Sequence, residues 1–224
     1  MNKKYIKISL VLNISIFLMV VFAALVMFTG FKFMHGPEVI LDCSNIEMFK
    51  FFTVDSNVFM AIVALIFSIY EILLLKNKIK EIPKFMYILK FMGTSAVTLT
   101  FLVVFSYLGW IAKDGLFSLL MNSNLFLHLL VPIASIITFI CFEKNDKLKF
   151  KDTFLGLVPM LIYAIFYMSN VFIHTHDGVV SPDYDFYYFV YYGVWTTIIV
   201  VPIVITMNYV SSLILWKLNK KGNK

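Results

Sequence analysis

The sequence contains no arginine, and charged residues of every kind make up only 14% of its 224 residues. A soluble domain carries roughly 25% charged residues, so this chain has too few of them to keep a folded surface wetted. Hydrophobic residues, by contrast, make up 61% of the chain. This composition excludes an ordinary soluble domain and indicates a protein embedded in a lipid bilayer.

Cysteine is scarce as well, with only Cys43 and Cys141 present. We expect these two residues on opposite sides of the membrane, too far apart for a disulfide. No CxxC, CxxCH or paired Cys/His spacing indicates a metal or haem site. The G-x-S-x-G and H-E-x-x-H motifs of hydrolases and the glycine-rich phosphate loop are also missing. We therefore expect neither a metal nor a cofactor.

Long apolar runs are what the sequence does have. Each is close to the roughly 17 to 25 residues that a membrane-spanning helix needs, and the last is long enough to tilt. The first run is too long for a signal peptide and has no small-residue cleavage site, so we expect it to be retained. We predict an all-α polytopic membrane protein, a six-transmembrane-helix bundle forming one integral membrane domain over residues 1–224. The predicted spans are 8–31, 51–75, 87–110, 125–142, 155–173 and 187–215.

The lysines give the predicted bundle a direction. Only Lys32, Lys50 and Lys113 fall on one side of the membrane, whereas sixteen of the 19 fall on the other. The positive-inside rule then places both the N-terminus and the C-terminus in the cytoplasm. The sixteen are Lys3, Lys4, Lys7, Lys76, Lys78, Lys80, Lys84, Lys90, Lys144, Lys147, Lys149, Lys151, Lys217, Lys220, Lys221 and Lys224.

The remaining composition suggests where the protein works. Basic residues that are all lysine, together with many Ile, Phe and Asn residues, are typical of an AT-rich bacterial genome, so we expect a bacterial cell membrane. The outer loops carry acidic residues and the segment "DYDFYYFVYYGVW", which fits an interfacial aromatic belt. The net charge of +6 does not indicate a nucleic-acid partner, because the lysines are not gathered on one soluble face. The pattern leaves the oligomeric state open.

Polar residues interrupt the second and fourth runs at matched depth. Thr53, Ser56 and Asn57 share one face of the second helix, just below its outer end, because they are three and four residues apart. The fourth helix starts at the same outer level, with Asn124 and His128 one turn apart. Polar faces of membrane helices turn toward a cavity or toward each other. We therefore expect Thr53 and His128 to lie in one layer near the outer leaflet.

Other polar residues add to this layer or lie outside it. Tyr163, Tyr167, Asn170 and His174 form a stripe on the fifth helix, and Ser135 continues the fourth-helix stripe. Thr94 and Thr98 give the third helix a polar face at a more cytoplasmic depth. We expect Asp55 to be hydrated near the interface, without a clear role. We expect Glu71 and Lys90 to extend their charges to the cytoplasmic boundary, which makes them poor functional candidates.

Threonine and histidine together permit ester chemistry. A neutral histidine can take the proton of a threonine hydroxyl as it attacks an ester carbonyl, then give it to the leaving alcohol. Asn57, Asn124 or His174 could donate to the oxyanion, with Ser56 also near the substrate. The simpler interpretations are a threonine bonded to the carbonyl one turn back and a histidine buried for packing. A buried ionisable residue in a membrane span is the more suggestive of the two.

The two segments "FFTVDSNVFMA" and "NLFLHLLVPIASIITF" together resemble the androgen-induced and androgen-dependent transmembrane hydrolase family and its bacterial relatives, the FAR-17a-like or Pr6Pr membrane proteins. That family's proposed catalytic pair is the Thr of a T-x-x-[ST/L]-N element and the His of an L-H-x-x-x-P element. The matching residues are Thr53, before Ser56 and Asn57, and His128, before Pro132. The fifth span "FLGLVPMLIYAIFY" and the loop "SPDYDFYYF" are similar to further family elements. The resemblance implies an intramembrane threonine hydrolase of fatty acid esters of hydroxy fatty acids.

Two other functions fit the same residues. A non-enzymatic protein that binds or transports a lipid or small solute could use the same polar cavity. A haem or quinone protein could use His128 and His174 as ligands on neighbouring helices. A lipid ester hydrolase with Thr53 as nucleophile and His128 as general base is our leading hypothesis.

Overall fold

The computed structural model describes residues 3–36, 45–177, 179–181, 183–187, 190 and 194–220. Within them, six helices are long and apolar enough to cross a membrane. This confirms the predicted all-α bundle of six spanning helices. The six are Lys3–Thr29, Phe52–Leu75, Lys84–Leu108, Ser123–Phe142, Phe150–Ile173 and Thr197–Asn219.

Several of these spans consist of consecutive helical segments. The first span is α1 (Lys3–Thr29) and the second is α2 (Phe52–Leu75). The third is α3 (Lys84–Val103), the π-helical turn η2 (Val104–Leu108) and α4 (Gly109–Ile111). The fourth is α6 (Ser123–Leu125), the π-helical turn η3 (Phe126–Leu130), α7 (Val131–Ile137) and the π-helical turn η4 (Thr138–Phe142). The fifth is the 3₁₀ helix η5 (Phe150–Leu157) with α8 (Val158–Ile173), and the sixth is α9 (Val194–Asn219).

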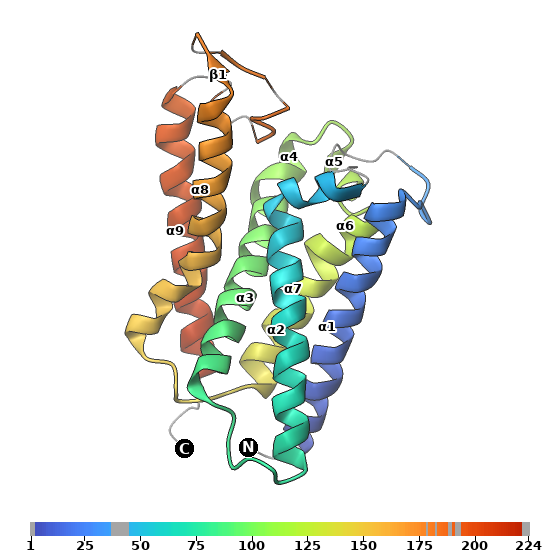
Figure 1. The fold of residues 1–224 in the computed structure, drawn as a ribbon, viewed down its shortest axis with the longest axis vertical. Coiled ribbons are helices and arrows are strands. Elements are labelled where there is room, and N and C mark those ends of the chain that lie inside the picture. The colour runs from blue at the N-terminus through green and yellow to red at the C-terminus, as the bar shows by residue number, and fades with distance from the viewer. Residues whose placement is uncertain are drawn as a thin grey trace.

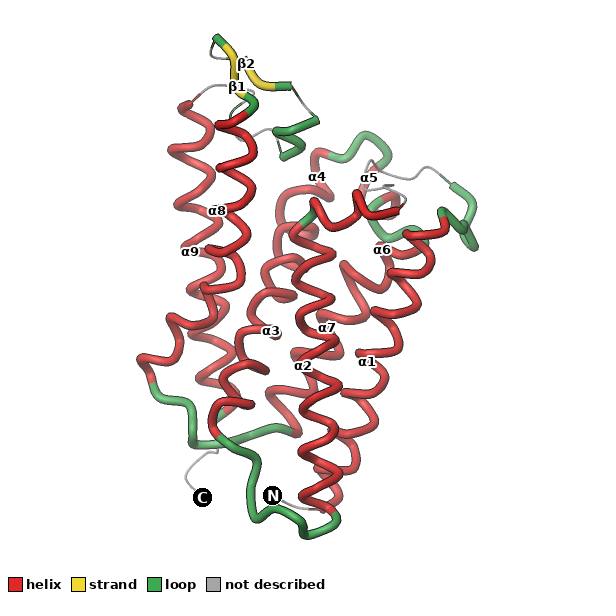
Figure 2. Tube along the Cα trace, in the orientation of Figure 1, coloured by secondary structure: helices red, strands yellow, loops and turns green. Residues whose placement is uncertain are grey.

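The two ends of the bundle differ in what they carry. Figure 1 shows that α1 begins and α9 ends at the same end, which we call the terminal end. The opposite end, the hairpin end, carries the 3₁₀ helix η1 (Asn45–Lys50), α5 (Gly115–Ser118) and an antiparallel pair of two-residue strands, β1 (Thr175–His176) and β2 (Val179–Val180). Figure 2 shows this small pair above the ends of α8 and α9.

The third span lies at the centre of the bundle. In its most apolar stretch 61% of the residues are buried, against 22% in the fifth and sixth spans. The α8–α9 pair lies on one side of α3, and the first, second and fourth spans lie on the other (Figure 1). Large apolar side chains such as Ile62, Ile165 and Phe172 remain more than half exposed. Such a surface is what a helix that faces lipid requires.

The α8–α9 pair is attached to α3 by small and polar residues. Ser95 on α3 bonds Ser212 on α9 with 2.6 Å between the hydroxyl oxygens, and it donates to Oδ1 of Asn208 at 3.0 Å. Gly156 of η5 lies against this contact, because a Cβ there would come within 2.3 Å of the Ser212 hydroxyl oxygen. Small residues let membrane helices approach closely, so this contact fixes where α9 and η5 meet the rest of the bundle.

The helix boundaries differ most from the prediction in the sixth span. We predicted a helix from residue 187, but α9 begins at Val194 and Tyr187 lies in a turn. The Tyr187 hydroxyl instead accepts the backbone N–H of Phe52 at 3.1 Å, and its ring packs against Phe51 and Tyr163. The aromatic loop thus folds over the start of α2. Of the cysteines, Cys141 is exposed, and Cys43 lies outside the described residues.

Candidate functional site

His128 lies in the π-helical turn Phe126–Leu130 of the fourth span. Pro132, four residues later, has no N–H to donate to the His128 carbonyl, so the regular α-helical hydrogen bond cannot form there. π-helical turns within α-helices occur frequently at functional sites. The local backbone therefore departs from a regular helix at the residue that the sequence singled out.

The His128 imidazole is fully buried and held through one nitrogen. Nδ1 lies 2.7 Å from the backbone carbonyl oxygen of Leu119. A carbonyl can only accept a hydrogen bond, so Nδ1 is the protonated nitrogen. Nε2 has no hydrogen-bond partner in the described part of the chain. A neutral His128 therefore presents an unpaired acceptor in the interior of the bundle.

Asn57 connects the turn of α2 that carries Thr53 to the fourth span. Its side-chain amide donates to the carbonyl of Thr53 at 2.7 Å and to the carbonyl of Leu127 at 3.1 Å. Leu127 immediately precedes His128, so the expected proximity of the two polar segments is present. The Ser56 hydroxyl also donates to the Thr53 carbonyl at 3.1 Å and lies 3.2 Å from the Thr100 hydroxyl.

Within the described residues, no hydrogen bond joins the two proposed catalytic side chains. Thr53 is half-buried, and within the described residues its hydroxyl makes no hydrogen bond to His128 or to another group. Asn124, one turn before His128, is buried, and its side-chain oxygen has no partner among the described residues. The Ser135 hydroxyl on the same stripe is likewise buried and without a partner in the described chain. Several unpaired polar atoms thus lie along this side of the fourth span.

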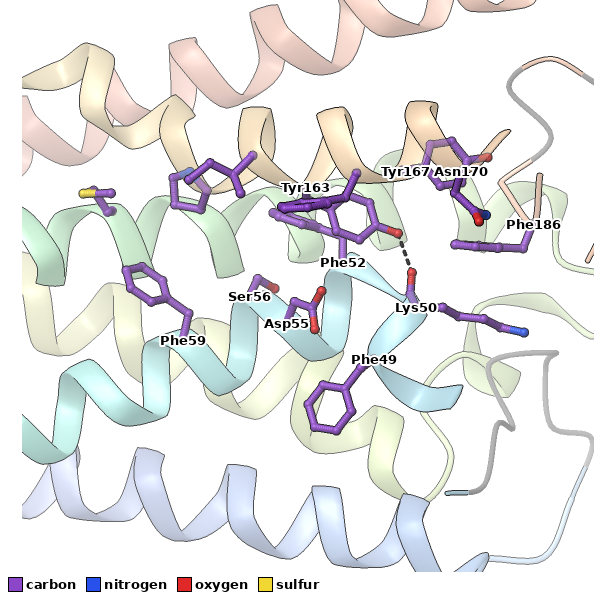
Figure 3. Close-up of a pocket in the computed structure, with 14 residues that line it drawn as sticks. Phe49, Lys50, Phe52, Asp55, Ser56, Phe59, Tyr163, Tyr167, Asn170 and Phe186 are labelled. Carbon is purple, nitrogen blue, oxygen red and sulfur yellow. Dashed lines mark hydrogen bonds between the residues drawn. The ribbon is translucent and has the colours of Figure 1, made fainter. Parts of the chain in front are cut away.

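A cavity of about 630 Å³ lies between α2 and α8 (Figure 3). Asp55 and Ser56 project into it from α2 and face Tyr163 on α8. Thr53, His128, Asn124 and His174 do not line it. The lining is Phe49, Lys50, Phe52, Asp55, Ser56, Phe59, Met92, Pro159, Ile162, Tyr163, Phe166, Tyr167, Asn170 and Phe186.

The cavity is open toward lipid and covered at the hairpin end. Ile162 and Phe166 of its wall are 52% and 71% exposed on the lipid-facing side of α8. At the hairpin end, Phe186 covers it, and Tyr167 donates to the buried carboxylate of Asp185. The neighbouring Tyr187 is so enclosed that burial raises its pKa to about 12. The cavity therefore opens on an apolar, exposed face of the bundle.

The sequence-predicted stripe on the fifth helix divides between two places. Tyr163, Tyr167 and Asn170 line the cavity, with the Tyr163 hydroxyl donating to the Lys50 carbonyl at 2.5 Å. His174 instead ends α8, where its ring stacks on Tyr184 with 3.7 Å between the ring centroids. Asp55, which had no expected role, turns out to be the one carboxylate among the residues that line the cavity.

The prediction for Glu71 and Lys90 was wrong. Both side chains are completely buried, and Lys90 pairs with the equally buried Glu143 at 3.2 Å. They face the bundle interior because polar partners on the first span, Ser9 and Asn13, meet them there. The signal that sequence reasoning missed is that Ser9 and Asn13 are one helical turn apart at the depth of Glu71 and Lys90.

No group of three or more His, Cys, Asp or Glu side chains within the described ranges is placed to hold a metal ion. Comparison of the chain with protein-family models, with characterised proteins and with solved structures finds no match. The arguments for function therefore rest on the fold, the cavity and the arrangement of polar side chains.

Proposed function

We propose that the protein is an integral membrane hydrolase of lipid esters, with its terminal end in the cytoplasm and its hairpin end outside. The lysine-rich segments 76–84 and 144–151 lie at the terminal end together with both chain termini (Figure 1). The positive-inside rule favours this orientation. It places the cavity and the Thr53–His128 layer in the outer half of the bilayer, where water and lipid esters both have access.

The observation that carries the hydrolase proposal is the state of His128. Its bond to the Leu119 carbonyl fixes the neutral tautomer with the proton on Nδ1. A general base needs this form, in which the other nitrogen has a free lone pair. Nε2 is buried and without a partner in the described chain, although an unpaired buried polar atom costs stability. A catalytic role for His128 would explain why Nε2 is left unpaired despite this loss of stability. The resemblance to the threonine hydrolase family supports the same role.

In the proposed reaction the Thr53 oxygen attacks the ester carbonyl carbon while His128 Nε2 takes the hydroxyl proton. The tetrahedral intermediate then collapses, and the alcohol leaves with the proton from His128. Water, deprotonated by His128, next hydrolyses the acyl-threonine and restores the hydroxyl. Substrate binding must bring the Thr53 hydroxyl within hydrogen-bond reach of Nε2, directly or through one water, because no hydrogen bond joins them in the described chain.

The polar neighbours divide into positioning and binding roles. Both N–H groups of the Asn57 amide already donate to backbone carbonyls, so we assign Asn57 to positioning. The side-chain NH₂ group of Asn124, one turn from His128, is our candidate donor to the oxyanion, because the amide nitrogen donates whereas its oxygen can only accept. The cavity is suited to an acyl chain, and Ser56 connects it to Thr53, because Ser56 lines the cavity and bonds the Thr53 carbonyl.

The test is turnover of ester substrates by purified protein in lipid nanodiscs. Thr53→Ala and His128→Ala should each lower the rate by at least ~100-fold, and Thr53→Ser should retain part of the activity. Thr138→Ala is a matched control, because this buried threonine of the fourth span bonds only the Ala134 carbonyl, at 2.6 Å. Full activity in folded Thr53→Ala or His128→Ala protein would exclude the mechanism.

A second function, binding of an amphiphile without chemistry, is favoured by one observation. The cavity between α2 and α8 does not include Thr53 or His128 in its lining. A binding protein predicts saturable uptake of an acyl-chain probe with no product formed. It also predicts that Thr53→Ala leaves this binding unchanged, whereas a bulky substitution at the cavity wall removes it.

A further inference from the structure

A second polar cluster lies inside the bundle toward the terminal end, and none of its side chains lines the cavity. It consists of Ser9, Asn13, Glu71, Lys90 and Glu143, which we call the carboxyl–lysine cluster. The five side chains come from α1, α2, α3 and the end of η4, and all five are fully buried. The hydrolysis proposed above does not use any of them.

The charges of the cluster do not balance when both carboxyls are ionised. Glu71 and Glu143 would then carry two negative charges against the single positive charge of Lys90. Tyr87 of α3 also interacts electrostatically with both carboxyls but is neutral at ordinary pH. From α1 the cluster receives only the neutral Ser9 and Asn13. An uncompensated charge in a membrane interior is costly, so one further positive charge is required.

The hydrogen bonds distinguish the two carboxyls. Oε1 of Glu143 accepts from Ser9 at 3.1 Å, from Asn13 at 2.8 Å and from the Lys90 ammonium group at 3.2 Å. Such a set of donors stabilises an ionised carboxylate.

Glu71 accepts from the Asn13 amide, 3.2 Å from Oε2, and also interacts with the Ser9 hydroxyl, but no ammonium group donates to it in the described chain. Its Oε1, like Oε2 of Glu143, has no hydrogen-bond partner within the described residues. The Lys90 ammonium group also donates to the Asn13 side-chain oxygen, which leaves Asn13 between the two carboxyls. Glu71 is therefore the carboxyl that is least prepared to hold a negative charge.

We propose that the carboxyl–lysine cluster is a proton-binding site, in which Glu71 holds one proton while Glu143 stays ionised against Lys90. The site is then neutral, with one carboxylic acid, one carboxylate and one ammonium group. Loss of the proton leaves two carboxylates in the interior, so the folded state loses stability as pH rises. A sodium ion would be a less suitable occupant, because the Lys90 ammonium group would repel it.

The charge count predicts a distinct outcome for each variant. Glu71→Gln imitates the protonated acid and should bind no proton. Glu143→Gln leaves one carboxylate against one ammonium group, so Glu71 should ionise and the proton should again be lost. Lys90→Met removes the positive charge, so protonation should persist. Glu81→Gln is the control, because Glu81 is 73% exposed and pairs with Lys147 at 3.0 Å outside the cluster.

Infrared spectroscopy of the full-length protein in nanodiscs tests the proposal directly. At neutral pH the wild-type protein should show a protonated-carboxyl band that is absent from Glu71→Gln and Glu143→Gln and retained in Glu81→Gln. The same band in wild type and Glu71→Gln would overturn the proposal, as would a band lost only in Glu143→Gln.

Thermal unfolding provides a second measurement on the same variants. Between about pH 5.5 and about pH 9.5 ordinary carboxyl and lysine side chains do not titrate, whereas histidines and the α-amino group titrate in both the wild type and Glu71→Gln. The melting temperature of the wild type should fall across this range, and that of Glu71→Gln should fall much less. Equal pH dependence in both proteins would overturn the proposal, and so would a melting temperature set by sodium against choline rather than by pH. None of these measurements depends on hydrolase activity.

Discussion

The two ends of the bundle differ in how their buried polar side chains are bonded, although each end holds some polar atoms without a partner in the described chain. Toward the terminal end, Lys90, Glu143 and Asn13 bond one another across three spans. Toward the hairpin end, the Asn124 oxygen and His128 Nε2 are buried without partners in the described chain. Paired groups hold helices together, whereas unpaired ones cost stability and leave atoms available to a ligand. We propose from this difference that the terminal end holds the spans together and that the hairpin end carries the proposed chemistry.

The largest loss of folding stability is expected from a substitution at Lys90. Lys90→Met removes the partner of a buried carboxylate, and removing one member of a buried ion pair costs about 3–5 kcal/mol. Chemical or thermal unfolding in detergent should show this loss. Lys84→Met is a control from the same helix, because Lys84 is 38% exposed, although its partner Asp152 at 2.7 Å is only 8% exposed. A pair with one solvated member contributes less than a fully buried pair, so equal losses in the two variants would contradict the cohesive role.

The next largest effect is expected where the α8–α9 pair meets α3. Gly156→Ala would place a Cβ within 2.3 Å of the Ser212 hydroxyl oxygen and 3.0 Å from that of Ser95. Overpacking of this kind costs about 1–3 kcal/mol. The double variant Gly156→Ala with Ser212→Ala should recover part of the lost stability, because it removes the closer atom. Thermal unfolding in detergent measures both variants. If the single variant is as stable as the wild type, the contact does not fix α9.

The sequence was sufficient to predict the six spans and the depth of the polar residues in them. It was not sufficient to predict which side chains face one another. Apolar length predicts a spanning helix because lipid requires it, and six helices follow from six runs. Depth is also predictable, since Asn57 does bond the residue before His128. Rotation about a helix axis is set by partners on other spans. This is why Lys90 looked like a boundary residue.

The cavity could not be predicted for a related reason. Its walls belong to α2 and α8, and their separation depends on the α3–α9 contact at Ser95 and on the loop residue Phe186. Neither contact has a signal in local periodicity. The late start of α9 has the same origin. Tyr187 lies in a turn over the start of α2, where its hydroxyl accepts the Phe52 N–H.

A substitution at Asn57 should distinguish an effect on folding stability from an effect on the proposed ester hydrolysis at the hairpin end. Asn57→Ala deprives the Thr53 and Leu127 carbonyls of their common donor, which should cost about 1–3 kcal/mol. If Asn57 positions the proposed Thr53–His128 pair, ester hydrolysis should fall further than stability does. Asn208→Ala is the control, since Asn208 is an equally buried amide that bonds Ser95 in the α3–α9 contact. Equal hydrolysis rates per folded molecule in the two variants would remove Asn57 from the site.

The smallest effect on stability is expected from a substitution at Asp55, a carboxylate that can be compared directly with Glu143. Asp55 is half-buried, lines the cavity and forms no hydrogen bond or ion pair in the described chain, in contrast to Glu143. Asp55→Asn keeps its shape and removes its charge. Its helix-terminal position stabilises α2 by only about 0.3–1 kcal/mol, so unfolding should change little.

The effect of Asp55→Asn should instead appear in what the cavity accepts. A charge within an aromatic cavity selects ligands by charge complementarity. Binding of a C12 trimethylammonium amphiphile should weaken several-fold relative to an uncharged C12 maltoside, as measured by calorimetry. Asp114→Asn, at the start of α5 and outside the cavity lining, should leave the ratio unchanged. An unchanged ratio in Asp55→Asn would mean that the cavity recognises only the apolar chain, and the carboxylate would then serve the helix alone.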